Sequence, residues 1–296
     1  MKKRINLKVD TKKESFLVLF IVYIFHLVFM IFVNNKTLVT DNKIFQYVLI
    51  FRIHRWILSF PIIYYFVKTY KKYKYFKTDE KLNIRNFIIY FALAFWVGNI
   101  SHILTTLTFK FKERTTLVEE PLYIDIIMTL CVAPILEEMV FRGVIMNNLK
   151  KYGIKTAIIV NSILFGVSHS NINMIIPAIL TGIIFSYTAY KYSLKYSILL
   201  HFLLNTLTKI SQVIIFSKIE ILIVSIGLFF IFLVIFLLIF LVIGLAKGKY
   251  KEIFSILKLD IEDRKSLVTF IKNNLLYLFV IFVIVISNLL FNYKLF

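Results

Sequence analysis

The fold is decided by one stretch, Ala133-Pro134-Ile135-Leu136-Glu137-Glu138-Met139-Val140-Phe141-Arg142-Gly143. This stretch lies inside an apolar run, residues 123–148, that is long enough to be a membrane span. A charge at the centre of a bilayer costs at least about 2.5–3.5 kcal/mol on insertion scales. The two carboxylates and the guanidinium must therefore face a protein interior or a water-filled cavity, where each of them needs a partner.

The composition is that of a membrane protein. Of the 296 residues 59% are hydrophobic and 17% aromatic, and the mean hydropathy is +0.82, whereas ordinary globular chains are about 45–50% apolar. The sequence therefore predicts an all-α fold, a polytopic bundle of about eight or nine transmembrane helices. The apolar runs are residues 16–33, 45–67, 87–109, 123–148, 157–168, 174–190, 197–216, 219–245 and 275–291.

The distribution of charge along the chain matches the division into apolar runs. The formal net charge is +20, but the lysines cluster between the apolar runs, which is typical of the positive-inside pattern and not of a nucleic-acid surface. The pattern predicts a cytoplasmic N-terminus and a retained first span in place of a cleaved signal peptide. The single cysteine, Cys131, excludes an internal disulfide framework. The residue usage indicates an AT-rich bacterial genome, so we expect the protein in the bacterial plasma membrane.

Two further polar clusters interrupt the apolar spans. They are Phe165-Gly166-Val167-Ser168-His169 and His201-Phe202-Leu203-Leu204-Asn205. In a helix, residues four apart share a face, so His201 lies beside Asn205. By the same rule Glu138 can pair with Arg142, while Glu137 points about 100° away and lacks that partner.

The distance of each cluster from the nearest lysines can be estimated at about 1.5 Å per helical residue. Glu137 then lies roughly 20 Å from Lys150, and His169 lies roughly 21 Å from Lys155. Counted from Lys195, His201 lies about 9 Å and Asn205 about 15 Å along the helix. Helix tilt shifts each value by several ångströms. The sequence therefore predicts that a carboxylate, two imidazoles and an amide meet inside the membrane.

These four groups are suited to hydrolysis. A carboxylate in a site of low dielectric constant is a useful general base, and an imidazole can help it to orient or deprotonate a water. Donors aimed at a developing oxyanion are typically worth about 2.7–4 kcal/mol each. The set therefore predicts attack of water on a carbonyl carbon, and peptide hydrolysis in the membrane fits it.

Taken together, Glu-Glu-x-x-x-Arg at 137–142, Phe-x-x-x-His at 165–169 and His-x-x-x-Asn at 201–205 resemble the three motifs of the CPBP family. That family comprises the CAAX prenyl endopeptidases and the bacteriocin-processing or immunity proteins called Abi. The resemblance covers about residues 121–210. It implies an intramembrane endopeptidase in which Glu137 is the general base and His169 shares the water. It further implies that His201 and Asn205 stabilise the oxyanion, with Glu138 and Arg142 as supporting partners.

The resemblance also bears on domains and cofactors. We expect residues 1–296 to form a single membrane domain, with N-terminal spans in 1–120, the catalytic core in 121–210 and C-terminal spans in 211–296. The resemblance favours a mechanism without metal. A zinc peptidase that uses Glu137 or Glu138 with His169 and His201 is the alternative, because zinc commonly takes three ligands of these types.

Each of the three polar clusters also has a structural interpretation. Glu137, Glu138 and Arg142 can be a buried ion network that fixes helix packing. His169 can be an interfacial histidine at a helix end, and His201 with Asn205 can be an interhelical hydrogen-bond pair, worth on average about 0.6 kcal/mol in membrane bundles. The whole chain can accordingly be a non-enzymatic membrane interaction or immunity protein with a peptidase-like fold.

The remaining predictions concern partners. Arg52, His54 and Arg55 interrupt the second apolar run; they either reach the outer interface or contact an anionic substrate group or lipid. The basic segment 68–85 is expected to set topology and to contact anionic lipid. The expected partners are a peptide or lipidated protein substrate and the lipid bilayer, with no nucleic acid. The oligomeric state stays open.

Overall fold

A computed structural model describes residues 63–76, 80–109, 126–169, 171–216 and 220–275, with a few isolated residues up to 286. It divides the chain into two units, Met1–Thr69 and Tyr70–Phe296, and every feature below lies in the second. In the described ranges all regular structure is helical, which confirms the all-α prediction. The first apolar run, Arg52, His54, Arg55 and most of the last run lie outside the described residues.

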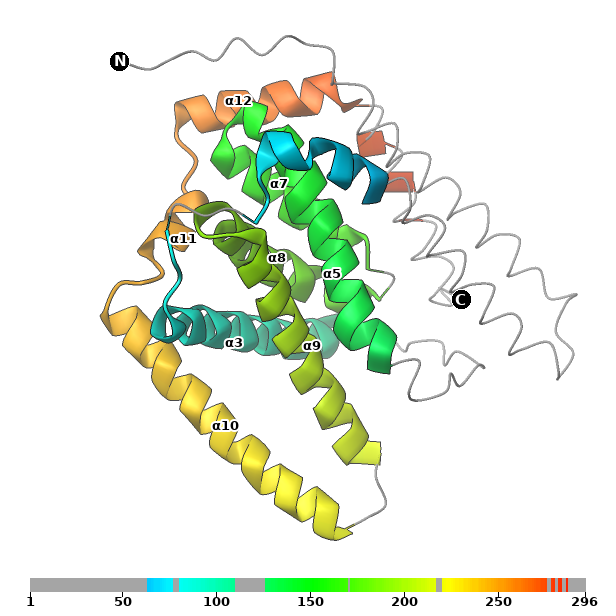
Figure 1. Cartoon of the computed structure of the whole chain (residues 1–296), viewed down its shortest axis with the longest axis vertical. Helices are drawn as coiled ribbons and strands as arrows, with labels where there is room; N and C mark the ends of the chain where they lie inside the picture. Colours follow the sequence, from blue (N-terminus) through cyan, green and yellow to red (C-terminus); the bar gives the residue numbers. More distant parts are fainter. Residues whose placement is uncertain are drawn as a thin grey trace, which may run out of the picture. The chain divides into compact units, whose positions relative to one another are not determined.

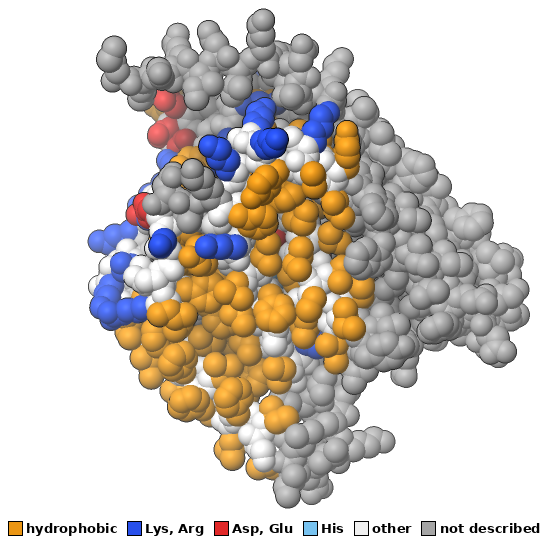
Figure 2. Space-filling model, in the orientation of Figure 1, with side chains coloured by type: hydrophobic (Ala, Val, Ile, Leu, Met, Phe, Trp, Pro, Cys, Tyr) orange, Lys and Arg blue, Asp and Glu red, His pale blue; other side chains and the backbone are white. Residues whose placement is uncertain are grey.

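Five long helices coincide with predicted spans and begin or end a few residues away from them. Three described segments are long and apolar enough to cross a membrane, namely Ile84–Thr108, Asn173–Lys191 and Val224–Ala246. The last of these is almost entirely unburied, and Figure 2 shows a broad apolar face on the molecule. This is a helical membrane protein. The five helices are α3 (Ile84–Phe109), α7 (Ile154–Val167), α8 (Ile172–Lys191), α9 (Leu194–Phe216) and α10 (Glu220–Ala246).

The span that carries the acidic pair is helical but irregular, which the sequence did not predict. Its α-helical segment α5 (Ala133–Glu138) lies between the π-helical segments η4 (Met128–Val132) and η5 (Met139–Ile145). Pro134 has no N–H to donate and its ring crowds the carbonyl one turn earlier, so a widened turn before it relieves the clash. The chain then continues through α6 (Met146–Leu149) and the short 3-10 helix η6 (Lys150–Tyr152).

Helix α8 is at the centre of the packing. It contacts α3, α7 and α9, and α5 contacts α9, so the glutamates and the second histidine come from neighbouring helices (Figure 1). Helix α10 packs on α3, where the Tyr250 hydroxyl donates to the Ile89 carbonyl at 3.0 Å. The side chain of Tyr250 occupies the space that a Cβ atom at Gly244 would need.

Gly166 sets how closely α7 approaches α8. A Cβ added there would lie 2.7 Å from the Ile175 carbonyl oxygen and would overlap the Ile179 side chain. We expect Gly166→Ala to destabilise the protein by about 1–3 kcal/mol, the usual cost of overpacking, measured by thermal unfolding in detergent. Gly227→Ala is the matched control, because no atom lies within 4 Å of its added Cβ. That control should be neutral or stabilising, since alanine is the better helix former. Equal effects of the two variants would contradict the packing argument.

Two short helices join the polar ends of the long ones. Helix α11 (Lys251–Ile256) carries Glu252, which accepts from Tyr187 at 2.6 Å and from Lys191 at 2.5 Å. Helix α12 (Ile261–Asn273) begins with a capping box between Asp260 and Asp263. It lies against α7 (Figure 1).

The contact between α12 and α7 makes a pH-dependent contribution to stability. Lys155 Nζ lies 2.6 Å from Asp263 Oδ2, and this hydrogen bond holds the pKa of Asp263 below its ordinary value of 3.8. The contribution is therefore present above pH 3.8 and is lost as the pH falls through the lowered pKa.

Lys155→Met should accordingly lower stability by about 0.2–1 kcal/mol, the range for a solvent-accessible pair. The difference in unfolding midpoint between wild type and Lys155→Met should be constant from neutral pH down to pH 3.8 and should shrink in strong acid to the contribution of the bond from Lys155 Nζ to the Lys258 carbonyl. A difference that persists unchanged in strong acid would show that the lysine acts through packing and not through charge.

Candidate active site

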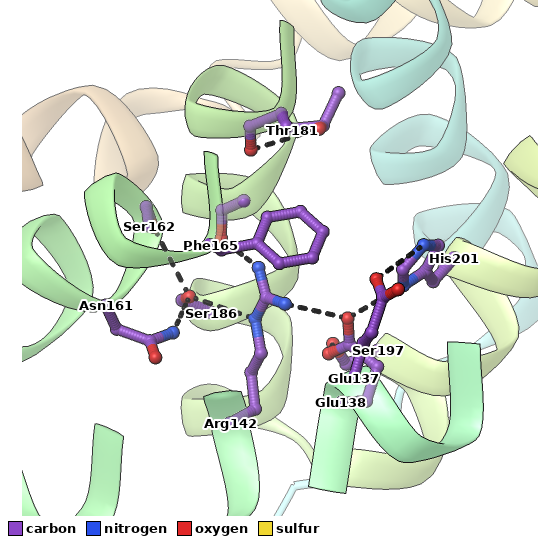
Figure 3. Close-up of polar contacts among 12 residues, drawn as sticks. Glu137, Glu138, Arg142, Asn161, Ser162, Phe165, Thr181, Ser186, Ser197 and His201 are labelled. Carbon is purple, nitrogen blue, oxygen red and sulfur yellow. Dashed lines mark hydrogen bonds and ion pairs between the residues drawn. The ribbon is translucent and has the colours of Figure 1, made fainter. Parts of the chain in front are cut away.

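The predicted site residues come from three neighbouring regions of the bundle. Glu137 and Glu138 end α5, and Arg142 lies in the π-helical turn that follows. His169 lies two residues after the end of α7, and His201 and Asn205 lie on α9. Figure 3 shows both glutamates, Arg142 and His201 converging beside α8.

Glu138 is completely buried and both of its carboxylate oxygens are occupied. Arg142 Nη1 donates to Oε1 at 2.8 Å, which is the four-residue pairing that the sequence predicts. His201 Nδ1 lies 3.0 Å from the same oxygen. The Ser197 hydroxyl donates to the other oxygen, Oε2. Glu138 is therefore an anchored anion with no exposed oxygen that could activate a water.

Arg142 is held as firmly as its partner. Its Nε donates to Ser186 Oγ at 3.3 Å and its Nη2 donates to the Gly182 carbonyl at 3.2 Å, both on α8. The guanidinium lies 4.3 Å from the centre of the Phe165 ring, a cation–π distance. Gly182 leaves room for this arrangement, because a Cβ there would lie 3.2 Å from both Nη2 and the Phe165 ring.

Glu137 has a different environment from its neighbour in sequence. Its side chain is 33% exposed, whereas that of Glu138 is 0% exposed. Its Oε2 lies 3.9 Å from His201 Nε2, which is beyond a direct hydrogen bond but within reach of one bridging water. The two adjacent carboxylates are thus divided between an anchored one and a partly accessible one, as the helical rotation of about 100° between them predicts.

His201 lies between the two carboxylates. Its Nδ1 faces Glu138 and its Nε2 faces Glu137 (Figure 3). The ring stacks on Phe185 with centroids 5.1 Å apart and meets the edge of Phe165 at 5.7 Å. These aromatic rings fix the plane of the imidazole, and the residue is only 6% exposed.

His169 reaches the site through Phe165. Its Nδ1 lies 2.9 Å from the Phe165 carbonyl oxygen, and the two rings meet edge to face with centroids 5.0 Å apart. Both predicted histidines therefore contact the same phenyl ring, but His201 is the one that the structure places against the carboxylates. His169 is partly buried at the end of its own helix.

Asn205 is hydrogen-bonded to the span that carries the glutamates, at a point two turns before Glu137. Its Nδ2 donates to the Thr129 carbonyl at 3.0 Å. Thr129 lies in the π-helical segment η4, where the widened turn presents a carbonyl to a side chain of another helix. This bond joins α9 to the span of the glutamates, so Asn205 helps to set the position of that span relative to His201.

Several residues of the site lie outside the predicted motifs. They are Ser197, Gly182, Phe185 and Ser186. A signal for Ser197 is present in the sequence, because Ser197, His201 and Asn205 recur every four residues along one helix face. The residues of α8 give a weaker signal, a glycine and a serine four apart on a mostly apolar helix.

The described residues contain no group of three or more His, Cys, Asp or Glu side chains placed to hold a metal ion. The residues of the zinc alternative also fit a metal poorly, because Arg142 lies 2.8 Å from Glu138 and His201 Nδ1 is turned to the same carboxylate. A cation there would have to displace the guanidinium that already pairs with Glu138.

The fold and the site define a class, the helical membrane proteins with a glutamate, arginine and histidine site buried among their spans. The particular family follows from comparison, since residues 119–207 match the family model described as Type II CAAX prenyl endopeptidase Rce1-like. This family is one of proteases, and the matched segment contains all three motifs. The resemblance of the three motifs is thereby confirmed. No curated protein and no solved structure gave a significant match.

Proposed function

We propose that this protein is an intramembrane endopeptidase that uses a glutamate to activate water. The observation that carries the proposal is the separation of 3.9 Å between Glu137 Oε2 and His201 Nε2, with Glu137 partly accessible and Glu138 anchored. A water placed between these two atoms meets a carboxylate on one side and an imidazole on the other, which is the arrangement that general-base catalysis needs.

In the proposed reaction the water oxygen bonds to the carbonyl carbon of the peptide while Glu137 accepts one of the water protons. The tetrahedral intermediate carries its negative charge on the former carbonyl oxygen. The carbon–nitrogen bond then breaks, and Glu137 returns the proton to the leaving amine. The products are a carboxylic acid and an amine, so the reaction consumes one water and leaves the enzyme unchanged.

The other predicted residues have proposed roles around this step. His169, whose ring meets that of Phe165 edge to face, is proposed to approach the water or the substrate when a peptide is bound. Asn205 is proposed to donate to the oxyanion with the N–H that does not bind Thr129. Glu138 and Arg142 are proposed as supporting residues that hold His201.

The proposed substrate is a membrane-associated peptide or a lipidated protein cleaved near its C-terminus or close to the bilayer. The site lies among apolar helices, so a substrate must reach it within or beside the lipid. Maturation of a bacteriocin or signalling peptide, or self-immunity, is the proposed context in a bacterial plasma membrane with the N-terminus of the enzyme in the cytoplasm.

The test compares membrane peptides from a deletion strain complemented with wild type or with Glu137→Gln. Peptides that are shortened by wild type and remain intact with the variant would identify the substrate and support the proposal. If the variant, at normal abundance, restores every property that wild type restores, the protein acts without catalysis, as a membrane interaction or immunity protein would.

Metal analysis distinguishes the zinc alternative. Protein purified without chelator should contain zinc well below one ion per chain, and chelator should not lower the rate of cleavage, because Glu138 is already neutralised by Arg142. The measurement is elemental analysis beside the cleavage assay, before and after dialysis against chelator. Stoichiometric zinc that leaves together with activity would establish a metallopeptidase.

A further inference from the structure

Ser197 is a fully buried residue that none of the three motifs contains. It lies on α9 one turn before His201, and its hydroxyl donates to Glu138 Oε2. The carboxylate of Glu138 is thus held by two successive turns of α9, by Ser197 at one oxygen and by His201 at the other. Arg142 fixes the second of these oxygens from its own helix.

The contact between His201 and Glu138 determines which nitrogen of His201 carries a proton. The carboxylate of Glu138 can only accept, so the His201 nitrogen that faces it at 3.0 Å, Nδ1, must donate. Arg142 lies 2.8 Å from the same oxygen, so the carboxylate of Glu138 already has a cationic partner and needs only a hydrogen bond from His201. A neutral imidazole with its proton on Nδ1 has a lone pair on Nε2.

The lone pair of Nε2 then faces Glu137 across 3.9 Å. Both groups are acceptors, and a water between them can donate one hydrogen to each. Its own lone pair is left free to attack. In this state Nε2 cannot donate to an oxyanion, so the geometry gives His201 a different role from the one that the motif resemblance implies.

We propose that Ser197 is a positioning residue, which holds Glu138 so that His201 keeps its proton on Nδ1 and shares the attacking water with Glu137. The position of the proton on Nδ1 is inferred from the contacts alone, whereas the shared water also depends on the proposed function. The oxyanion is then left to Asn205 and to donors other than His201.

The tautomer can be measured without any substrate. Protein with nitrogen-15 histidine is examined by NMR in lipid nanodiscs at neutral pH, with His201→Asn to assign the signal. His201 should be neutral and protonated on Nδ1 in wild type, and Ser197→Ala should convert it into a mixture of tautomers. Wild-type His201 found as an imidazolium, or protonated on Nε2, would overturn the proposal. An unchanged signal in Ser197→Ala would overturn the role of the serine.

Kinetics supply the second readout, with a peptide that wild type has been shown to cleave. Ser197→Ala should lower kcat by about 10- to 100-fold with KM within about twofold, because a misplaced group impairs the reaction and not binding. Ser197→Cys keeps the volume but is a weak donor, so it should be folded and similarly slow. Ser101→Ala, another buried serine on α3, should have the rate of wild type. A wild-type rate in both Ser197 variants would refute the inference while leaving the proposed hydrolysis intact.

Discussion

Replacing Glu137 with glutamine is expected to abolish peptide cleavage and to leave the fold intact. Glutamine has nearly the same shape but cannot accept a proton from water, and a general base typically contributes about 10²- to 10⁴-fold to the rate. The side chain is one-third exposed and lies beyond hydrogen-bond distance from His201, so little structure depends on its charge. We expect a loss of at least about 10³-fold in kcat with an unchanged unfolding midpoint.

The measurement pairs cleavage in proteoliposomes with thermal unfolding of the same preparations. Glu262→Gln is the matched control, because it makes the same change at an exposed position on α12 and should not alter either quantity. If Glu137→Gln cleaves at the rate of wild type, the general base is another residue. The difference in exposure between Glu137 and Glu138 is then unrelated to catalysis.

Replacing Glu138 with alanine is expected to cost the most stability of any change in the site. It leaves the guanidinium of Arg142, which is 1% exposed, without its counter-ion. Breaking a buried pair in this way typically costs about 3–5 kcal/mol. Removing both charges together, as Glu138→Gln with Arg142→Met, should cost much less, because no uncompensated charge remains. Both forms should be inactive, since each releases His201.

Unfolding by denaturant in detergent gives the comparison, and the pair between Lys191 and Glu252 provides the control. Those two atoms are 2.5 Å apart, but the Glu252 side chain is 62% exposed, so Lys191→Met, which leaves the bond from Tyr187 to Glu252 in place, should cost less than about 1 kcal/mol. Equal losses at the two pairs would mean that burial does not govern the energy of the Glu138 pair.

The sequence was sufficient to predict the positions of the long helices and one contact of the site, between Glu138 and Arg142. Helix class and the positions of the described spans follow from the lengths of the apolar runs, because a bilayer requires about 20 apolar residues for each crossing. The pairing of Glu138 with Arg142 follows from helical periodicity alone, since both residues lie on one helix. The same periodicity predicts that Glu137 faces elsewhere.

Contacts between helices were harder to predict. Counting residues from the lysines places His169 roughly 21 Å and His201 about 9 Å along their helices, yet it gives no information on how each helix is rotated about its axis. Only the packing of α9 against α5 turns His201 toward both carboxylates, whereas His169 is turned toward Phe165. Ser197 was missed because a serine in an apolar helix commonly bonds to its own backbone.

The π-helical turns around α5 have a consequence for insertions and deletions. A π-helical turn holds one residue more than an α-helical turn, so removing one residue from Met139–Ile145 would let the segment relax into a regular helix. Side chains on the two sides of the deletion would then keep roughly their present azimuths, whereas the same deletion in a regular α-helix turns every side chain beyond it by about 100°. A deletion placed after Arg142 within this segment should therefore leave its contacts with Ser186 and Gly182 in place, so this span tolerates the loss of one residue better than a regular membrane helix does.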